Sequence, residues 1–258
     1  MRNLLACTAA AMLLAAPLAR ADYHMRSPTE IDFGEVEIEH NGAAAFDHFK
    51  DNSGARSYTV EIGTGLTPWW HTEVEVGFQR DSGAAQPTLL DALVWENMFQ
   101  LAEPGEYWAD PGFYIEYGQS LTRGRHASAN EITFGPAVSK DIGKTTNSIN
   151  LFFTRLLGPD QTTQGLDFTY AWQTKWNVSE RLSPALEIYG DAGVVGRSPA
   201  LSQQQMLIGP VALGAFKLHD LGLGNAGKLK YEIGYLFGAT PASPNGVVRW
   251  RLELEIPF

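Results

Sequence analysis

A histidine and a serine lie two positions apart, at His126 and Ser128, and Glu131 follows three residues after the serine. A serine hydroxyl becomes a nucleophile when a histidine takes its proton and an acid orients that histidine, so these residue types could support ester hydrolysis. Such pairs also arise by chance. The neighbouring Arg123 and Arg125 fit a simple contact with phosphate groups instead. Hydrolysis is therefore a secondary hypothesis.

Other catalytic and metal-binding patterns are weak. His40 and His48 share one stretch with Asp47 and Asp51, which could bind a metal ion, although a solvated loop is the commoner explanation for such a group. The sequence lacks the G-x-S-x-G, H-E-x-x-H and Walker motifs of common hydrolases and nucleotide-binding proteins. We predict no metal site and no cofactor.

The composition narrows the class of protein. The 258 residues include 13 Phe, 9 Tyr and 7 Trp, which is too aromatic for a disordered chain. The formal net charge of −10 argues against a nucleic-acid partner, because a protein that follows phosphates needs a basic face. No stretch after the N-terminus supplies the roughly 20 apolar residues of a membrane-spanning helix.

The first 21 residues have the pattern of a secretory signal peptide. Arg2 precedes an apolar stretch at residues 4–14, and Ala19 and Ala21 supply the small residues of a cleavage site. A lipoprotein signal around Cys7 is the alternative, but the apolar stretch continues well past that cysteine. We expect residues 22–258 to form a single exported domain without a disulfide.

The remainder alternates between apolar and polar residues in stretches of about ten, separated by Gly, Pro, Asn and Asp. Alternation of period 2 places each set of side chains on one face of a sheet. The predicted strands are residues 30–40, 57–66, 71–80, 89–101, 112–121, 129–140, 148–157, 166–178, 184–192, 205–218, 228–238 and 247–258.

These strands favour an all-β, antiparallel, up-and-down transmembrane barrel of about 12 strands over a secreted β-sandwich. Their length suits a tilted crossing of a bilayer, and aromatic residues gather near their ends. We expect the connections to alternate in length, with residues 41–56 as a long outer loop and residues 67–70 as a short periplasmic turn. Ten strands is the alternative, because residues 30–40 and 89–101 are the least regular.

The C-terminus carries a resemblance to a broad protein class. Trp250, Leu252, Leu254, Ile256 and the terminal Phe258 alternate with polar residues. This pattern resembles the last strand of Gram-negative outer-membrane proteins, which the barrel-assembly machinery recognises. The resemblance implies that these five residues act as an assembly signal. It also implies an outer-membrane location, with periplasmic chaperones, lipid and lipopolysaccharide as partners.

Two local resemblances are more limited. The hairpin at residues 58–70 resembles hairpins of the transporter barrels grouped as a phenol-degradation family. His126 and Ser128 resemble the His-x-Ser pair of lipid A deacylases, which would make Ser128 the nucleophile, His126 the base and Glu131 the orienting acid.

The alternate set of side chains should face the lumen, and much of it is charged. The first strand would supply Glu30, Asp32, Glu35, Glu37 and Glu39, with a bulge at Gly34. Arg249 and Arg251 should lie near these acids, because the last strand must pair with the first to close the barrel. The predicted pore-lining residues are Glu61, Glu73, Glu75, Glu116, Glu187, Lys230, Arg249, Arg251 and Glu253.

Two functions fit such a lumen. An open lumen would make a passive channel for small hydrophilic or charged solutes, and reversing the charge of both arginines would shift its selectivity toward cations. A lumen filled by salt bridges would make a structural or interaction barrel. Glycines expected at or near inward positions favour the open lumen or relieve crowding at bends: Gly63, Gly65, Gly77, Gly118, Gly190 and Gly234. We predict the channel.

Overall fold

The computed structural model describes residues 23–49, 53–83, 86–124, 127–224 and 226–258. The predicted signal peptide lies outside the described residues, as do Asp51, Arg125 and His126. No helix within the described ranges is long and apolar enough to cross a membrane.

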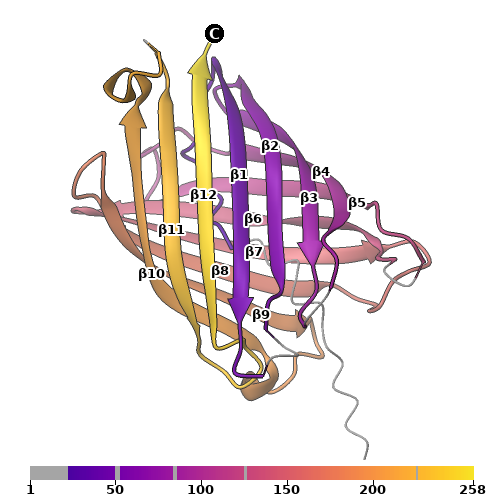
Figure 1. The fold of residues 1–258 in the computed structure, drawn as a ribbon. Coiled ribbons are helices and arrows are strands. Elements are labelled where there is room, and N and C mark those ends of the chain that lie inside the picture. The colour runs from indigo at the N-terminus through magenta and orange to yellow at the C-terminus, as the bar shows by residue number, and fades with distance from the viewer. Residues whose placement is uncertain (1–22, 50–52, 84–85, 125–126, 225) are drawn as a thin grey trace, which may run out of the picture.

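Twelve strands in the described part of the chain form one closed antiparallel barrel, in which each strand pairs with its neighbours in sequence (Figure 1). The ring closes where β1 pairs with β12. The predicted all-β, up-and-down barrel of 12 strands is confirmed, and the ten-strand alternative is wrong. The strands are β1 (Glu35–Phe46), β2 (Arg56–Thr67), β3 (Trp70–Arg80), β4 (Leu89–Gln100), β5 (Asp110–Ser120), β6 (Asn130–Ile142), β7 (Thr145–Leu157), β8 (Asp167–Trp176), β9 (Ser183–Val194), β10 (Gln205–Lys217), β11 (Lys228–Gly238) and β12 (Gly246–Pro257).

The first strand differs from its prediction. β1 begins at Glu35 rather than residue 30, and Gly34 is the turn residue before it, with a φ of 89°, rather than a bulge. The strand continues to Phe46 through a stretch that the sequence assigned to a loop. A small residue is needed at Gly42, because the ring of its cross-strand partner Trp250 lies over it.

The alternation of side chains produces two distinct faces. On β12, Arg249 and Glu253 are buried inside the barrel, whereas Leu252 and Ile256 are exposed on the outside. The exposed apolar side chains recur around the barrel, as expected of a surface that contacts lipid.

Several glycines are covered by neighbouring side chains rather than opening space. A Cβ on Gly42 would meet the ring of its cross-strand partner Trp250, and one on Gly190 would meet Tyr170. A Cβ on Gly63 would lie 2.9 Å from both His71 Nε2 and Glu73 Cβ. These glycines therefore relieve crowding, which was the alternative explanation from sequence.

The connections do not alternate in length as predicted. The chain enters β1 and leaves β12 at one end of the barrel, here called the terminal end (Figure 1). Connections at this end include short turns at residues 68–69 and 143–144, but also longer ones at residues 101–109 and 218–227. At the opposite end the predicted long loop shrinks, because β1 extends to Phe46. Loop length alone does not distinguish the two ends.

Candidate functional site

Residues 23–32, here called the lumen segment, run inside the barrel before β1 begins. Tyr23 packs edge-on against Tyr189 of β9, with ring centroids 5.6 Å apart. His24, Met25 and Arg26 are all at least nine-tenths buried. The segment therefore occupies the lumen rather than adding to the wall, contrary to the prediction that Glu30 and Asp32 belong to the first strand.

Arg26 attaches the lumen segment to several strands. Its guanidinium Nη2 lies 2.6 Å from Glu96 of β4, and Cζ lies 5.3 Å from the ring centroid of Tyr114 on β5. Its backbone N–H donates to Asn150 Oδ1 at 2.9 Å, and Asn150 Nδ2 donates back to the Arg26 carbonyl at 2.7 Å. Since Asn150 belongs to β7, one residue of the segment connects two sides of the barrel.

Cavities lie on both sides of this crossing. A cavity of about 470 Å³ at the terminal end is lined by Glu30, Lys175 and Lys230, among others. A second, of about 110 Å³, lies toward the opposite end and is lined by Tyr23, Glu75 and other acidic residues. A third cavity of about 40 Å³ separates Met25 and Arg26 from the acids of β1 and β3. The lumen segment thus lies at the narrow part of the interior.

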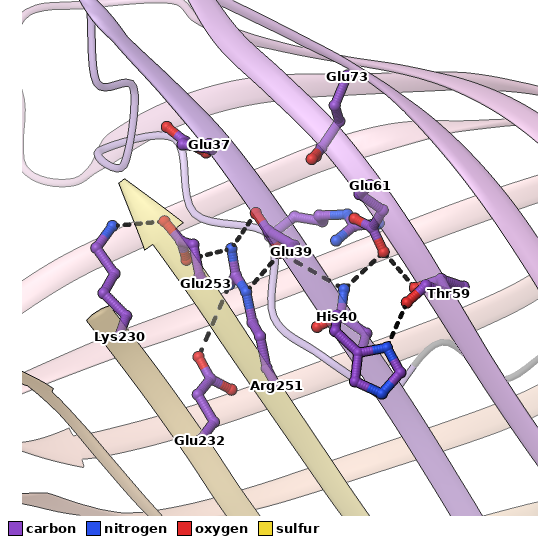
Figure 2. A network of polar contacts seen from close by, with 12 residues as sticks. Glu37, Glu39, His40, Thr59, Glu61, Glu73, Lys230, Glu232, Arg251 and Glu253 are labelled. Atoms are coloured by element: carbon purple, nitrogen blue, oxygen red, sulfur yellow. Dashed lines mark hydrogen bonds and ion pairs between the residues drawn. The ribbon is translucent and has the colours of Figure 1, made fainter. Parts of the chain in front are cut away.

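A continuous ion-pair cluster crosses the seam between β11, β12 and β1 (Figure 2). Arg251 donates to Glu39 through Nε at 2.7 Å and Nη2 at 2.8 Å, and its Nη2 also lies 2.9 Å from Glu253. Lys230 Nζ lies 3.0 Å from Glu253 Oε1 and 3.3 Å from Asp32 of the lumen segment. We call Glu39, Lys230, Arg251 and Glu253 the seam cluster.

Asp32 of the lumen segment is ionised beside the seam cluster. Burial alone would raise the pKa of the Asp32 carboxyl, but the charges of Lys230 and Lys228 and hydrogen bonds to Lys230 and Glu255 together hold that pKa below its usual range. Asp32 therefore stays ionised and attracts Lys230.

Arg249 lies opposite Ala43 of β1 in the sheet, but its guanidinium binds acids of β9 and β11 rather than the acids of the first strand that the sequence suggested. Its Nε and Nη2 donate to the two oxygens of Glu187 on β9 at 2.9 and 2.6 Å, and Nη2 lies 2.6 Å from Glu232 on β11. Glu187 also accepts from Tyr189 at 2.9 Å and from Gln173 at 2.7 Å. Side-chain reach, which strand adjacency does not reveal, lets Arg249 span β10 and β11 to reach β9.

The back of the lumen, on β6–β8, is mostly neutral at its middle. Ser139 and Ser148 share a hydroxyl hydrogen bond of 2.9 Å, as do Thr133 and Thr154. Ser139 Oγ also lies 3.4 Å from Ser27 Oγ of the lumen segment. This wall satisfies its polar groups without charge.

The structure places the predicted pore-lining residues as follows: Glu61, Glu73, Glu75, Glu187, Arg249 and Glu253 are buried in the interior, and Glu116, Lys230 and Arg251 are half-buried. Whether these residues line a solute path stays a prediction. The sequence analysis missed Arg26 and Asn150. The sequence does contain an indication of the role of Arg26, because this basic residue lies between the predicted cleavage site and an acidic strand.

The hydrolase candidates are only partly described. Ser128 Oγ shares hydrogen bonds with the hydroxyls of Ser120 at 2.8 Å and Thr122 at 2.9 Å. A Cβ on Gly118 would meet the Glu131 side chain at 3.2 Å, which places Glu131 over β5. His126 lies outside the described residues, so its relation to Ser128 stays a hypothesis.

Carboxylates gather where metal ligands could converge. Oxygen atoms of Glu37, Glu39 and Glu253 lie within 4.8 Å of one another, as do those of Glu39, Glu61 and Glu73. The sequence analysis, which predicted no metal, did not bring these residues together, because they come from β1, β2, β3 and β12.

Comparison with solved structures adds a fold relationship. An outer-membrane channel from Pseudomonas putida F1 aligns with 89% of this chain and 98% of its own length, with a TM-score of 0.60 and 10% identity. The chain has the fold of an outer-membrane β-barrel channel. The outer-membrane protein OprD from Pseudomonas aeruginosa aligns with 87% of this chain and 65% of its own length, with a TM-score of 0.38 and 7% identity. No protein-family model and no curated protein matches the sequence.

Proposed function

We propose that this protein is a passive outer-membrane channel for small hydrophilic or charged solutes. The observation that carries the proposal is a closed barrel that is apolar outside and charged inside, with a cavity at each end of its lumen. Charged walls need water or counter-ions, and a lumen that admits both can pass small ions. The shared fold with a protein described as an outer-membrane channel supports the same function.

The proposal includes orientation and biogenesis. With an even number of strands, both chain ends lie at one end of the barrel, which we assign to the periplasm. Trp250, Leu252, Leu254, Ile256 and Phe258 would be the signal for the barrel-assembly machinery, after export by a cleaved signal peptide and delivery by periplasmic chaperones. Lipid and lipopolysaccharide would surround the folded protein.

A second function, a structural barrel that conducts nothing, has one specific observation in its favour. The lumen segment crosses the interior and is held there by Arg26, with Glu96 on one side and Asn150 on the other. If that segment closes the path completely, the barrel would act through its loops. Hydrolysis by His126 and Ser128 has no comparable support, and the aligned structure is described as a channel.

Single-channel recording separates these functions. Mature protein refolded in detergent and inserted into planar bilayers should give small, discrete conductance steps. Selectivity should favour cations, because inward acids outnumber the basic side chains with which they pair. Folded protein that inserts but never conducts would support the structural barrel. Release of fatty acid from lipid A by the same preparation would support the hydrolase.

A further inference from the structure

The small cavity beside the seam cluster contains carboxylates that the described basic side chains do not neutralise. This cavity, of about 40 Å³, is lined by Glu37, Glu39, Glu73 and Glu253, together with Lys230 and other residues. A volume of this size accommodates a water molecule or one ion. The cavity lies between the lumen segment and the wall, and it shares Glu30, Lys230, Arg251 and Glu253 with the larger cavity at the terminal end.

Glu37 is the side chain that lacks a partner. It is 96% buried, and its Oε1 has no hydrogen-bond partner among the described residues. Its other oxygen, Oε2, lies 3.7 Å from His71 Nε2. Figure 2 draws no contact from Glu37 to the residues around it. A buried carboxylate in this state is strongly unfavourable unless a proton or a cation compensates it.

Glu73 repeats this arrangement on the neighbouring side. It is 92% buried, and its Oε2 has no hydrogen-bond partner in the described part of the chain. Its Oε1 lies 3.8 Å from the same His71 nitrogen. One imidazole cannot neutralise two carboxylates, even when it is protonated.

The basic side chains that line the cavity, Arg26, Lys230 and Arg251, already bind other carboxylates, and Arg26 is bound by Glu96. Lys230 is bound by Asp32 and Glu253, and also by Glu255. Arg251 gives both sides of its guanidinium to Glu39 and Glu253. Arg251 also lies 3.8 Å from Glu232, so these three basic side chains already face six carboxylates before Glu37 and Glu73 are counted. They leave no full positive charge for Glu37 or Glu73.

We propose that Glu37, Glu39 and Glu253 bind one divalent cation, for which Ca²⁺ is the best fit, with Glu73 as a further ligand. Ca²⁺ prefers oxygen ligands, mostly carboxylates, at 2.3–2.6 Å, so ligand atoms on opposite sides of the ion are separated by about 5 Å. The three carboxylates offer oxygens within 4.8 Å of one another. Mg²⁺ needs shorter, strictly octahedral contacts, and soft metals need sulfur or nitrogen ligands.

This cation site does not depend on the proposed channel function, because a bound ion would compensate the acids whether or not the barrel conducts. It would also join strands from the two ends of the chain, since Glu37 and Glu39 belong to β1 and Glu253 to β12. Bound Ca²⁺ should therefore stabilise the closed barrel over the open chain.

The test is isothermal titration calorimetry of refolded, lipopolysaccharide-free protein with CaCl₂ in detergent. The buffer contains 150 mM NaCl, which screens the surface charge and so suppresses non-specific binding of Ca²⁺. We expect one Ca²⁺ per chain. E37Q should lower the affinity at least tenfold, and E73Q should lower it by a smaller factor. E131Q is the matched control, because it removes one carboxylate that lines the cavity toward the opposite end. Its affinity should stay within twofold of wild type.

Folding does not limit this test. Glu37 Oε1 has no hydrogen-bond partner within the described residues, so E37Q should unfold in EDTA at the same urea concentration as wild type or higher. Wild-type protein that binds no Ca²⁺ up to 10 mM overturns the proposal. So does Ca²⁺ binding that E37Q and E73Q leave unchanged.

Discussion

The two sides of the lumen satisfy their buried polar side chains in different ways. The seam side, formed by β11, β12 and β1, carries Arg249 and Arg251 in ion pairs with buried glutamates. The back side, β6–β8, carries serine and threonine hydroxyls that bond to each other, such as Ser139 with Ser148. A neutral pair loses little when both members go, whereas a buried charge that loses its partner is costly. The comparison therefore predicts that the seam is sensitive to mutation and the back is tolerant.

Among single substitutions, R249M should give the largest loss of stability. Arg249 is 1% exposed and lies 2.6 Å from both Glu187 and Glu232. Removing it leaves buried carboxylates uncompensated, at a cost of about 3–5 kcal/mol. Urea unfolding of refolded protein, followed by gel mobility with and without heating, measures this cost.

R181M is the matched control for that variant. Arg181 pairs with Asp220 at 3.0 Å, but its side chain is 66% exposed, so the change should stay below about 1 kcal/mol. If R249M and R181M unfold at the same urea concentration, the seam does not depend on its buried charges.

Charge reversal at the seam should be worse still. R249E/R251E places new acids against Glu39, Glu187 and Glu253, so we expect poor refolding rather than the clean shift in selectivity that the sequence suggested. Refolding yield by heat-modifiable gel shift measures the effect. A well-folded double variant with altered selectivity would show instead that water compensates these acids.

The back wall should respond with a smaller, non-additive change. S139A leaves the buried Ser148 hydroxyl without this partner, at a cost of about 1–3 kcal/mol. S139A/S148A removes both hydroxyls and should cost less than the sum of the two single variants. Fully additive unfolding free energies would mean that the two hydroxyls do not depend on each other.

Deletion of Phe258 should have the smallest effect on the folded barrel. Its side chain is 82% exposed, and its described contact is a backbone hydrogen bond from Phe258 N–H to the Gly34 carbonyl. Refolding in detergent should be nearly unchanged, while the amount of barrel in outer membranes should fall severalfold. Wild-type levels in cells would contradict its role as part of an assembly signal.

The sequence predicted the wall of the barrel better than its contents. Period-2 alternation is a local property, and it placed β11 at residues 228–238, as observed. The start of β1 was missed because Glu30 and Asp32 continue the acidic alternation, although Gly34 turns the chain before the strand. Alternation alone does not show that a polar segment of the right length turns back into the lumen.

The pairing of charges inside was also beyond local pattern. Arg251 reaches Glu39 because β12 and β1 are neighbours, which closure of the barrel requires. Arg249 donates to Glu187 of β9, three strands away in the sheet, because its long side chain crosses the curved interior. The curvature of the sheet and the direction of the side chain determine which acid pairs with Arg249. Neither can be read from the spacing of residues along one strand.

The central claim is that ions pass through this lumen and that residues 23–32 narrow the path. Single-channel conductance of the mature protein, compared with a variant lacking residues 23–32, tests it most directly, once heat-modifiable gel mobility shows that both are folded. We predict a small conductance for the mature protein and at least a threefold larger one for the deletion. Equal conductance would place the path elsewhere, and no conductance from the deleted barrel would contradict a channel altogether.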